Sequence, residues 1–409
     1  MQALLMIKIG LIGKTNTGKT TFFNSATLAS AEISNYPFTT KQPNVGNAHA
    51  ITLCVHKEFA VQDQPRNSRC IDGWRFIPIE LVDLPGLIKG AWEGKGLGNQ
   101  FLSIAAQSDA LLHIVDASGS IDASGKIAEP GSGDPVADVG DIEEEMVMWY
   151  LKLFEANRDK IARAIGGGAD PVASITEVFR GIGVREEHVQ AALAQNKLAG
   201  VDLDDFGPQQ SKDFCWSLRD ISKPTLIVAN KVDLPTATDN FRRLREEYKD
   251  MIVVPSSADA ELTLRRAESK GLIKYVPGDE RFDIRDQSSL NDKQKWALNL
   301  IRKDILGEYM RTGVQFAINV AVFKLLKMNA IYPVADAKKL ADKHGNVLPD
   351  VYLMRAGSTV EDLAKEIHTD LAKGLLYAVD ARDGLHLPTD YHLKDRDVLS
   401  IVSAKKKGK

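Results

Sequence analysis

The sequence predicts an α/β fold with a mostly parallel sheet, a helical insert and a separate C-terminal α+β domain. Three observations indicate this arrangement. Short apolar runs, typical of buried parallel strands, alternate with helical segments along much of the chain. Residues 120–219 show helical spacing after a Gly/Ser/Pro-rich loop, with no strand signal. From residue 329 onward, short strands surround one well-patterned helix.

Several apolar segments are candidates for the strands of the parallel sheet. They are residues 7–12, 75–83, 110–118, 223–233 and 251–258. A Gly-rich turn and a helical segment follow the first of them, and a charged helical segment precedes the last. The sheet is therefore expected to be interrupted by the helical insert and then resumed, as exposed loops between elements tolerate.

Changes in amino-acid composition and hydrophobic pattern divide the chain into parts. We assign residues 1–119 and 220–275 to the α/β domain, 120–219 to the helical insert and 276–328 to a helical connector. Residues 329–404 form the α+β domain, and 405–409 a basic tail. In the α+β domain, Ser358 is expected to cap the helix, with Glu361 three residues later completing a capping box.

Composition excludes several classes of protein. The 409 residues are 44% hydrophobic and 26% charged, with a net charge of −3, so no global basic field indicates DNA binding. No apolar run reaches the about 18 residues that a membrane span needs. None of the cysteines, Cys54, Cys70 and Cys215, stands in a C-x-x-C pair. We therefore expect no disulfide framework, no zinc site and a cytoplasmic location.

The strongest motif is a phosphate loop. Gly13-Lys14-Thr15-Asn16-Thr17-Gly18-Lys19-Thr20 matches GxxxxGK(S/T), between a predicted strand and a predicted helix. The backbone N–H groups of such a loop, here with Thr17, Gly18 and the following Thr21, curl around phosphates. Lys19 would reach the β- and γ-phosphates, and the Thr20 hydroxyl would ligate Mg²⁺. Asn16 has two open interpretations: its amide oxygen binds a monovalent cation, or its side chain stabilises the loop.

A D-x-x-G motif follows the second apolar segment. Asp83 would hold Mg²⁺ through water, and the Gly86 N–H would bond the γ-phosphate. The next residue is Leu87, where small GTPases carry a Gln that orients the attacking water. A threonine from a mobile segment should also close on Mg²⁺ and the γ-phosphate. Thr39 and Thr40 both qualify, and we choose Thr40.

A third motif indicates which base is bound. Asn230-Lys231-Val232-Asp233 follows an apolar strand segment, and a carboxylate there can accept two hydrogen bonds from guanine. Adenine lacks that donor pair, so the group would be left unpaired. A backbone N–H at Ser257-Ala258 would lie near guanine O6. A solvated N-K-V-D loop is the other interpretation of this motif.

Together these motifs resemble the Obg-type GTPases. NYPFTT-x-x-PNVG, DLPGLIKGA and GxGLGNQFL carry the resemblance, which is closest to the archaeal-type members of the YchF-related branch. The resemblance implies a hydrophobic residue in place of the catalytic Gln, as Leu87 is, and potassium assistance through Asn16. Some YchF relatives depart from N-K-x-D and prefer ATP, whereas this chain keeps Asp233.

The C-terminal segment from LPDVYLMRAGSTVEDLAKEIHTDL to DYHLKDRDVLSIV resembles a TGS domain. That likeness implies a ubiquitin-like fold and a contact with the ribosome or RNA, to which the basic tail would add. A scaffold role for the domain, and a merely frayed tail, stay open.

The expectation is a cytoplasmic, Mg²⁺-dependent, slow GTPase switch, in which Lys19, Thr40 and Gly86 serve catalysis. An ATPase of the same fold, or a nucleotide-holding scaffold without turnover, is the alternative.

Overall fold

The computed structural model describes residues 6–27, 34–35, 43–87, 89–94, 98–201 and 205–404. Thr39, Thr40 and the tail 405–409 lie outside the described residues. The chain packs as two compact units. One comprises Lys8–Gly46 and Leu81–Ala317, and the other comprises Met1–Ile7, Asn47–Glu80 and Ile318–Lys409. Residues 47–80, which the sequence assigns to the α/β domain, thus pack in one unit with the C-terminal module, and the finer division of the chain stays a proposal.

The large sheet has the strand order β2-β3-β5-β1-β6-β7-β8, with β4 paired to β5. Its strands are β1 (Lys8–Ile12), β2 (Ser34–Asn35), β3 (Asn44–Leu53), β4 (Arg69–Ile71), β5 (Trp74–Asp83), β6 (Ala110–Asp116), β7 (Thr225–Asn230) and β8 (Val253–Ser256). β1, β6, β7 and β8 pair in parallel, as the apolar runs predict. The sequence reading missed β3, because its segment NVGNAHAITL has few large apolar residues.

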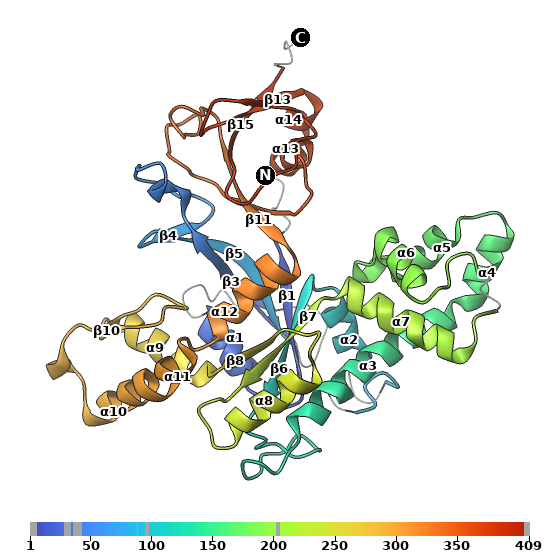
Figure 1. The fold of residues 1–409 in the computed structure, drawn as a ribbon, viewed down its shortest axis with the longest axis horizontal. Helices are drawn as coiled ribbons and strands as arrows, with labels where there is room; N and C mark the ends of the chain where they lie inside the picture. The colour runs from blue at the N-terminus through green and yellow to red at the C-terminus, as the bar shows by residue number, and fades with distance from the viewer. Residues whose placement is uncertain are drawn as a thin grey trace. The chain divides into compact units, whose positions relative to one another are not determined.

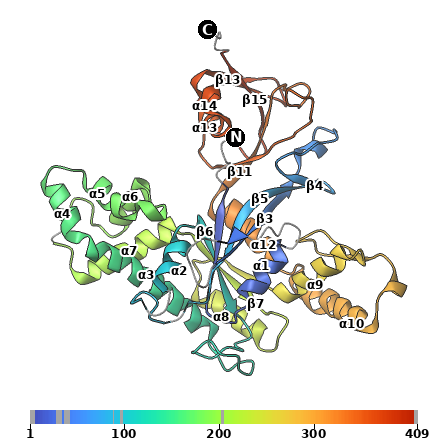
Figure 2. The same cartoon turned by 180° about the vertical axis from the view of Figure 1, so that it is seen from behind.

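Helices cover both faces of the parallel part of the sheet (Figures 1 and 2). On one side α1 (Lys19–Thr27) packs against α9 (Ala258–Ser269). The other side is covered by α2 (Gly98–Ala106), α3 (Pro135–Ala156) and α8 (Ala237–Glu247), which bury apolar residues of β6 and β7. This arrangement places the carboxyl ends of β1, β5, β6 and β7 at one edge, where parallel α/β sheets bind ligands.

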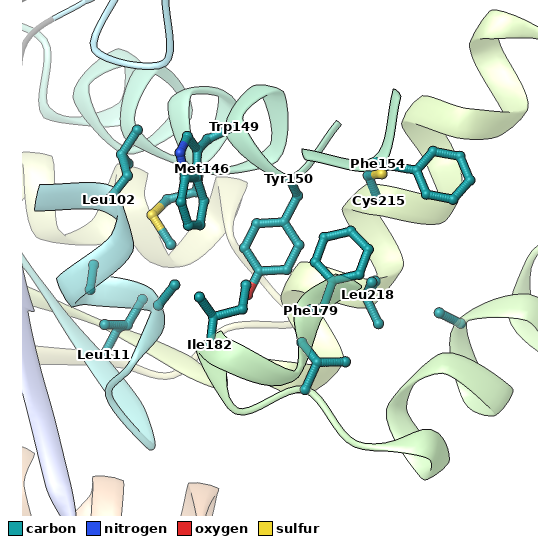
Figure 3. Close-up of a cluster of buried hydrophobic side chains, with 14 of the residues drawn as sticks. Leu102, Leu111, Met146, Trp149, Tyr150, Phe154, Phe179, Ile182, Cys215 and Leu218 are labelled. Carbon is teal, nitrogen blue, oxygen red and sulfur yellow. The ribbon is translucent and has the colours of Figure 1, made fainter. Parts of the chain in front are cut away.

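The insert is helical, and an aromatic core holds it together. It continues from α3 through α4 (Arg158–Gly166), α5 (Pro171–Phe179), α6 (Glu186–Gln195) and α7 (Pro208–Ser222). Figure 3 shows Tyr150 beside Phe179, with ring centroids 5.6 Å apart. A buried ion pair between Glu143 and Arg219, 2.7 Å long, joins α3 to α7. Such a pair resists separation, because removing one partner leaves an uncompensated buried charge.

After α9 the same unit continues through short elements. These are a hairpin of β9 (Ile273–Lys274) and β10 (Asp283–Ile284), then α10 (Asp292–Leu300), η5 (Ile301–Leu306), α11 (Gly307–Tyr309) and the start of α12 (Val314–Asn319). Thr312 accepts a backbone hydrogen bond from Ser257, 2.8 Å long. The segment that follows α11 therefore supports the loop at the end of β8.

The C-terminal module has a mixed sheet of five strands in the order β12-β11-β15-β13-β14. These are β11 (Met328–Val334), β12 (Tyr352–Arg355), β13 (Leu375–Asp380), β14 (His386–Leu387) and β15 (Val398–Ser403), with α13 (Val360–Ile367) and α14 (Thr369–Lys373). The predicted helix cap was wrong by one residue. Thr359, not Ser358, caps α13, and Asp362 completes the capping box. Both serine and threonine make good caps, so pattern alone could not separate the two registers.

Within the described part of the chain, none of the helices combines the length and the apolar character that crossing a bilayer requires.

Candidate functional site

The phosphate loop lies between β1 and α1. Neighbouring atoms lie so close to two of its positions that only glycine fits there. Gly13 has φ +140°, and a Cβ there would lie 2.3 Å from the carbonyl oxygen of Ile114. Gly18 has φ +97°, and its Cβ would lie 2.3 Å from the side-chain nitrogen of Asn230. Both the backbone conformation and the space exclude a side chain. The loop is therefore fixed in a shape in which backbone N–H groups can surround an anion.

Lys19 lies folded into this loop. Its Nζ donates to the carbonyl oxygens of Gly13, at 3.1 Å, and of Lys14, at 2.5 Å. Burial lowers the pKa of Lys19 to about 8, and the Asp83 carboxylate only partly opposes this effect. A phosphate group would supply the negative charge that the buried ammonium lacks.

Thr20 and Asp83 meet beside Lys19, as the motifs predict. The Thr20 hydroxyl donates to Asp83 Oδ2 at 2.8 Å, and Asn44 Nδ2 donates to the same oxygen at 3.2 Å. Asp83 Oδ1 is buried and has no hydrogen-bond partner among the described residues. Burial raises the pKa of Asp83, despite the hydrogen bonds from Thr20 and Asn44. An unpaired buried carboxylate oxygen beside a hydroxyl fits the oxygen ligands that Mg²⁺ prefers.

Gly86 touches the phosphate loop directly. A Cβ at this position would lie 2.6 Å from the backbone nitrogen of Thr15. The next residue, Leu87, donates its N–H to the Gly13 carbonyl oxygen at 3.1 Å, while its side chain is 2% exposed in the apolar core. Leu87 is thus a packing residue in this conformation, which explains why a polar side chain is absent there.

The segment after Leu87 is held by the insert. Glu145 of α3 accepts hydrogen bonds from the backbone N–H groups of Gly90, at 2.5 Å, and Trp92, at 3.0 Å. Glu145 itself is 5% exposed. A second contact joins the insert to the phosphate loop, since Lys14 Nζ lies 2.6 Å from Asp138 of α3. The sequence reading missed Glu145 and Asp138, because it treated α3 only as an amphipathic helix.

The base-recognition motif lies at the carboxyl end of β7. Asn230 Nδ2 donates to the carbonyl oxygen of Thr17 at 2.9 Å, which joins this loop to the phosphate loop. Lys231 Nζ lies 3.0 Å from Asp116, at the end of β6. Asp233 is exposed. Asp116 is a further site residue that the motifs did not indicate, although it lies in the predicted strand segment 110–118 and ends β6.

The two backbone N–H groups predicted to lie near guanine O6, those of Ser257 and Ala258, both donate hydrogen bonds within the protein. Ser257 caps α9 and its backbone N–H donates to Thr312. The Ala258 N–H donates to Asn230 Oδ1 at 3.1 Å. A contact from the Ala258 N–H to guanine O6 therefore stays a prediction. It requires this N–H to be shared between Asn230 and the base, or to leave Asn230.

Asn16 makes the loop-stabilising contact that was one of its two interpretations. Its Nδ2 donates to the Gly125 carbonyl oxygen at 2.9 Å, and Thr15 Oγ1 reaches the same oxygen at 2.9 Å. Asn16 is exposed, with φ 61°. Because the nitrogen end of the amide faces Gly125, the oxygen end is the one a cation would use.

Comparison with known proteins places this site in a family. Residues 8–137 match the family described as 50S ribosome-binding GTPase, and residues 228–336 match Obg-like GTPase YGR210-like, G4 motif-containing domain. An uncharacterized GTP-binding protein of Methanocaldococcus jannaschii is 44% identical over 98% of this chain and 100% of its own length. The chain belongs to the Obg-like GTPases of the YGR210-like, YchF-type branch. Residues 343–403 match the TGS domain, so the family, fold class and C-terminal module predicted from the motifs are confirmed.

Solved structures and further relatives agree with this assignment. The GTP-binding protein from Pyrococcus horikoshii OT3 is 34% identical, with a TM-score of 0.78 over 97% of this chain and 100% of that one. The YchF GTPase of Schizosaccharomyces pombe shares the fold, at 16% identity and a TM-score of 0.54 over 97% of each chain. A Bacillus subtilis relative, 28% identical over 65% of this chain and 70% of its own length, is named ribosome-binding ATPase YchF. This chain is a GTP-binding protein of the family.

The burial of Leu87 yields a prediction about catalysis and stability. Leu87→Gln should lower the free energy of unfolding by about 1–3 kcal/mol, because it places an amide in an apolar core. It should not accelerate nucleotide hydrolysis, since the side chain at this position is buried in the apolar core. Denaturant unfolding and single-turnover hydrolysis measure the two effects. Leu87→Met, which keeps the apolar contact, is the control, and fast hydrolysis by the Gln variant would contradict the argument.

The lowered pKa of Lys19 predicts a pH dependence of nucleotide binding. Nucleotide binds the protonated ammonium, which the free protein loses as pH rises through about 8. Affinity for GDP should therefore fall about threefold between pH 7.5 and pH 8.5, the ratio of protonated fractions for that pKa. Fluorescent-nucleotide titration measures it. Lys19→Arg, which stays charged, should give a flat profile, and a flat profile in the unchanged protein would contradict the prediction.

Proposed function

We propose that this protein is a cytoplasmic Mg²⁺-dependent GTPase that works as a nucleotide-controlled switch on the ribosome or a ribosome-associated RNA. One observation carries the nucleotide part: Asp83 Oδ1 is buried beside Thr20, Lys19 and the phosphate loop, and no described residue hydrogen-bonds to it. An oxygen in that state costs free energy until a cation satisfies it. This buried oxygen supports the proposal that the site binds Mg²⁺ together with phosphate.

In this proposal, Thr20 and Asp83 hold Mg²⁺, and Thr40 joins them when nucleoside triphosphate binds. The ion neutralises charge on the β- and γ-phosphates. Lys19 exchanges its hydrogen bonds with Gly13 and Lys14 for phosphate oxygens, and the Gly86 N–H bonds the γ-phosphate. With Leu87 buried, the group that orients water must come from elsewhere, and K⁺ bound at the Asn16 amide oxygen is our candidate.

The switch would use the segment 83–102. GTP would bring Gly86 toward the γ-phosphate, and hydrolysis would release it, as in other nucleotide switches. The segment is coupled to the insert by Glu145, so the insert is the element that would report which nucleotide is bound. Turnover without a partner should be slow.

We propose the ribosome as the partner because similar proteins are named for binding it. A relative is named for ribosome binding, and one family matched here is described by it. The TGS domain and the basic tail 405–409 are the proposed contact regions. The alternative is an ATPase of the same fold, which the names of YchF relatives favour, and Asp233 is the observation against it.

Base choice can be tested at Asp233. Asp233→Asn should weaken GTP binding about 100-fold, because it removes the acceptor of two charge-assisted hydrogen bonds, and should improve binding of xanthosine triphosphate. Competition against labelled GDP measures both. Asp239→Asn, an exposed carboxylate on α8 paired with Arg242, is the matched control. Displacement of GTP by equal concentrations of ATP would instead support the ATPase.

The switch is tested by ribosome co-sedimentation of the full chain. We expect binding with a non-hydrolysable GTP analogue and at least about tenfold weaker binding with GDP, a coupling within the usual allosteric range. Lys19→Ala should lose the difference between the two nucleotides. Equal sedimentation in both states would rule out nucleotide control of this interaction.

A further inference from the structure

Away from the nucleotide site, four side chains of metal-ligating type meet in the unit that contains the C-terminal module. Cys54 follows β3, His56 lies in η1 (Val55–Lys57), Asp63 in the next loop and Cys70 in β4. One ligand atom from each lies within 4.8 Å of all the others. The first three are buried and Cys70 is half-buried. The expectation of no zinc site rested on the lack of paired cysteines, so it could not register a histidine and an aspartate brought in by folding.

The distances within this cluster fit weak hydrogen bonds to sulfur, and they also fit ligands around a metal ion. Asp63 Oδ2 lies 3.3 Å from Cys54 Sγ and 3.4 Å from His56 Nδ1, and His56 Nδ1 lies 3.4 Å from Cys70 Sγ. The His56–Asp63 contact is longer than the about 2.7–2.9 Å of a charge-assisted N–H···O bond. In a tetrahedral zinc site, metal–sulfur bonds of about 2.3 Å and metal–N/O bonds of about 2.0–2.2 Å place neighbouring ligand atoms about 3.3–3.8 Å apart. These three distances fall within that range.

The charges of the cluster also balance with an ion. Arg75, which is fully buried, places Nη1 3.6 Å from Asp63 Oδ2. A divalent ion that replaces the two thiol protons leaves the net charge unchanged. Arg75 then serves as an outer partner that orients the Asp63 carboxylate.

We propose that Cys54, His56, Asp63 and Cys70 form a structural binding site for a zinc-type divalent metal ion. Two thiolates and an imidazole select a soft or borderline metal over Mg²⁺. Four protein ligands close a tetrahedral site and leave no open position for substrate, so the ion is structural and not catalytic.

The ion would fasten a strap defined by residues 54–70. Between Asp63 and Cys70, this strap pairs with residues 347–351 of the same unit. The Gln64 N–H donates to the Val347 carbonyl oxygen at 2.8 Å, and the Arg66 N–H donates to that of Pro349 at 2.7 Å. A metal that holds both ends of the strap would keep this pairing in place, since it removes the freedom that loop closure otherwise costs.

Metal content is the first test, on the full chain purified without a polyhistidine tag from zinc-containing medium. We expect about one zinc per chain by elemental analysis, the stoichiometry of one closed site. Cys70→Ser and Asp63→Asn should each lose at least about tenfold in zinc affinity, measured against a chromophoric chelator. Cys215→Ala is the matched control, because Cys215 is a buried cysteine in the core of the other unit. GDP binding by each variant checks that the nucleotide unit has folded.

Cobalt gives an independent readout. Co²⁺ added to the chelator-treated protein should produce the visible bands of a tetrahedral ion and thiolate charge-transfer absorption. Asp63→Cys, which supplies a third thiolate, should retain the metal and strengthen the charge-transfer band. Removing the ion should raise hydrogen exchange at Gln64 and Arg66.

Three results would overturn the proposal. One is unmodified protein with less than about a tenth of an equivalent of zinc and no cobalt bands. Another is zinc that Cys215→Ala loses as readily as Cys70→Ser does. A Cys54–Cys70 disulfide found in place of metal would also refute it.

Discussion

The side chain of Asn230 is the constraint on which the nucleotide site depends. It lies 2% exposed at the end of β7, donates to the Thr17 carbonyl oxygen and accepts from the Ala258 N–H. One amide thus connects the phosphate loop, the base-recognition motif and the start of α9. Because both of its bonds are buried, loss of either leaves an unsatisfied polar group, so the three segments are held in one geometry. It also explains Gly18, where any side chain would displace this amide.

The residues of the candidate site could be selected from sequence because they stand in contiguous motifs at strand ends. Lys19, Thr20 and Asp83 meet as predicted, since carboxyl ends of neighbouring parallel strands share an edge. Contacts from distant segments could not be read this way. Glu145 and Asp138 reach the site from a helix whose pattern shows only amphipathicity. The cap of α13 was misplaced because Ser358 and Thr359 are equally good caps, and tertiary packing decided between them.

The role of Leu87 also depended on tertiary structure. From sequence, it is a missing polar helper. In the fold, it belongs to one apolar cluster with Ala91 and Leu102, and that cluster continues without a break into Met146 and Trp149 of α3 (Figure 3). Interiors are closely packed, so a side chain in such a cluster cannot move without its neighbours. Leu87 is therefore better understood as the point where the D-x-x-G segment joins the core of the insert.

This continuous packing limits which conformational changes can connect the nucleotide site to the insert. The insert contacts the phosphate loop through Lys14 and Asp138, and the segment after Gly86 through Glu145. Any displacement of that segment must break the two backbone hydrogen bonds at Glu145 or carry α3 with it. Breaking them leaves a carboxylate at 5% exposure without those donors, which is costly. Carrying α3 is resisted by the ion pair of Glu143 with Arg219, unless α7 moves too. In the proposed switch, the motion that breaks the fewest of these contacts would therefore be a shift of α3 and α7 together.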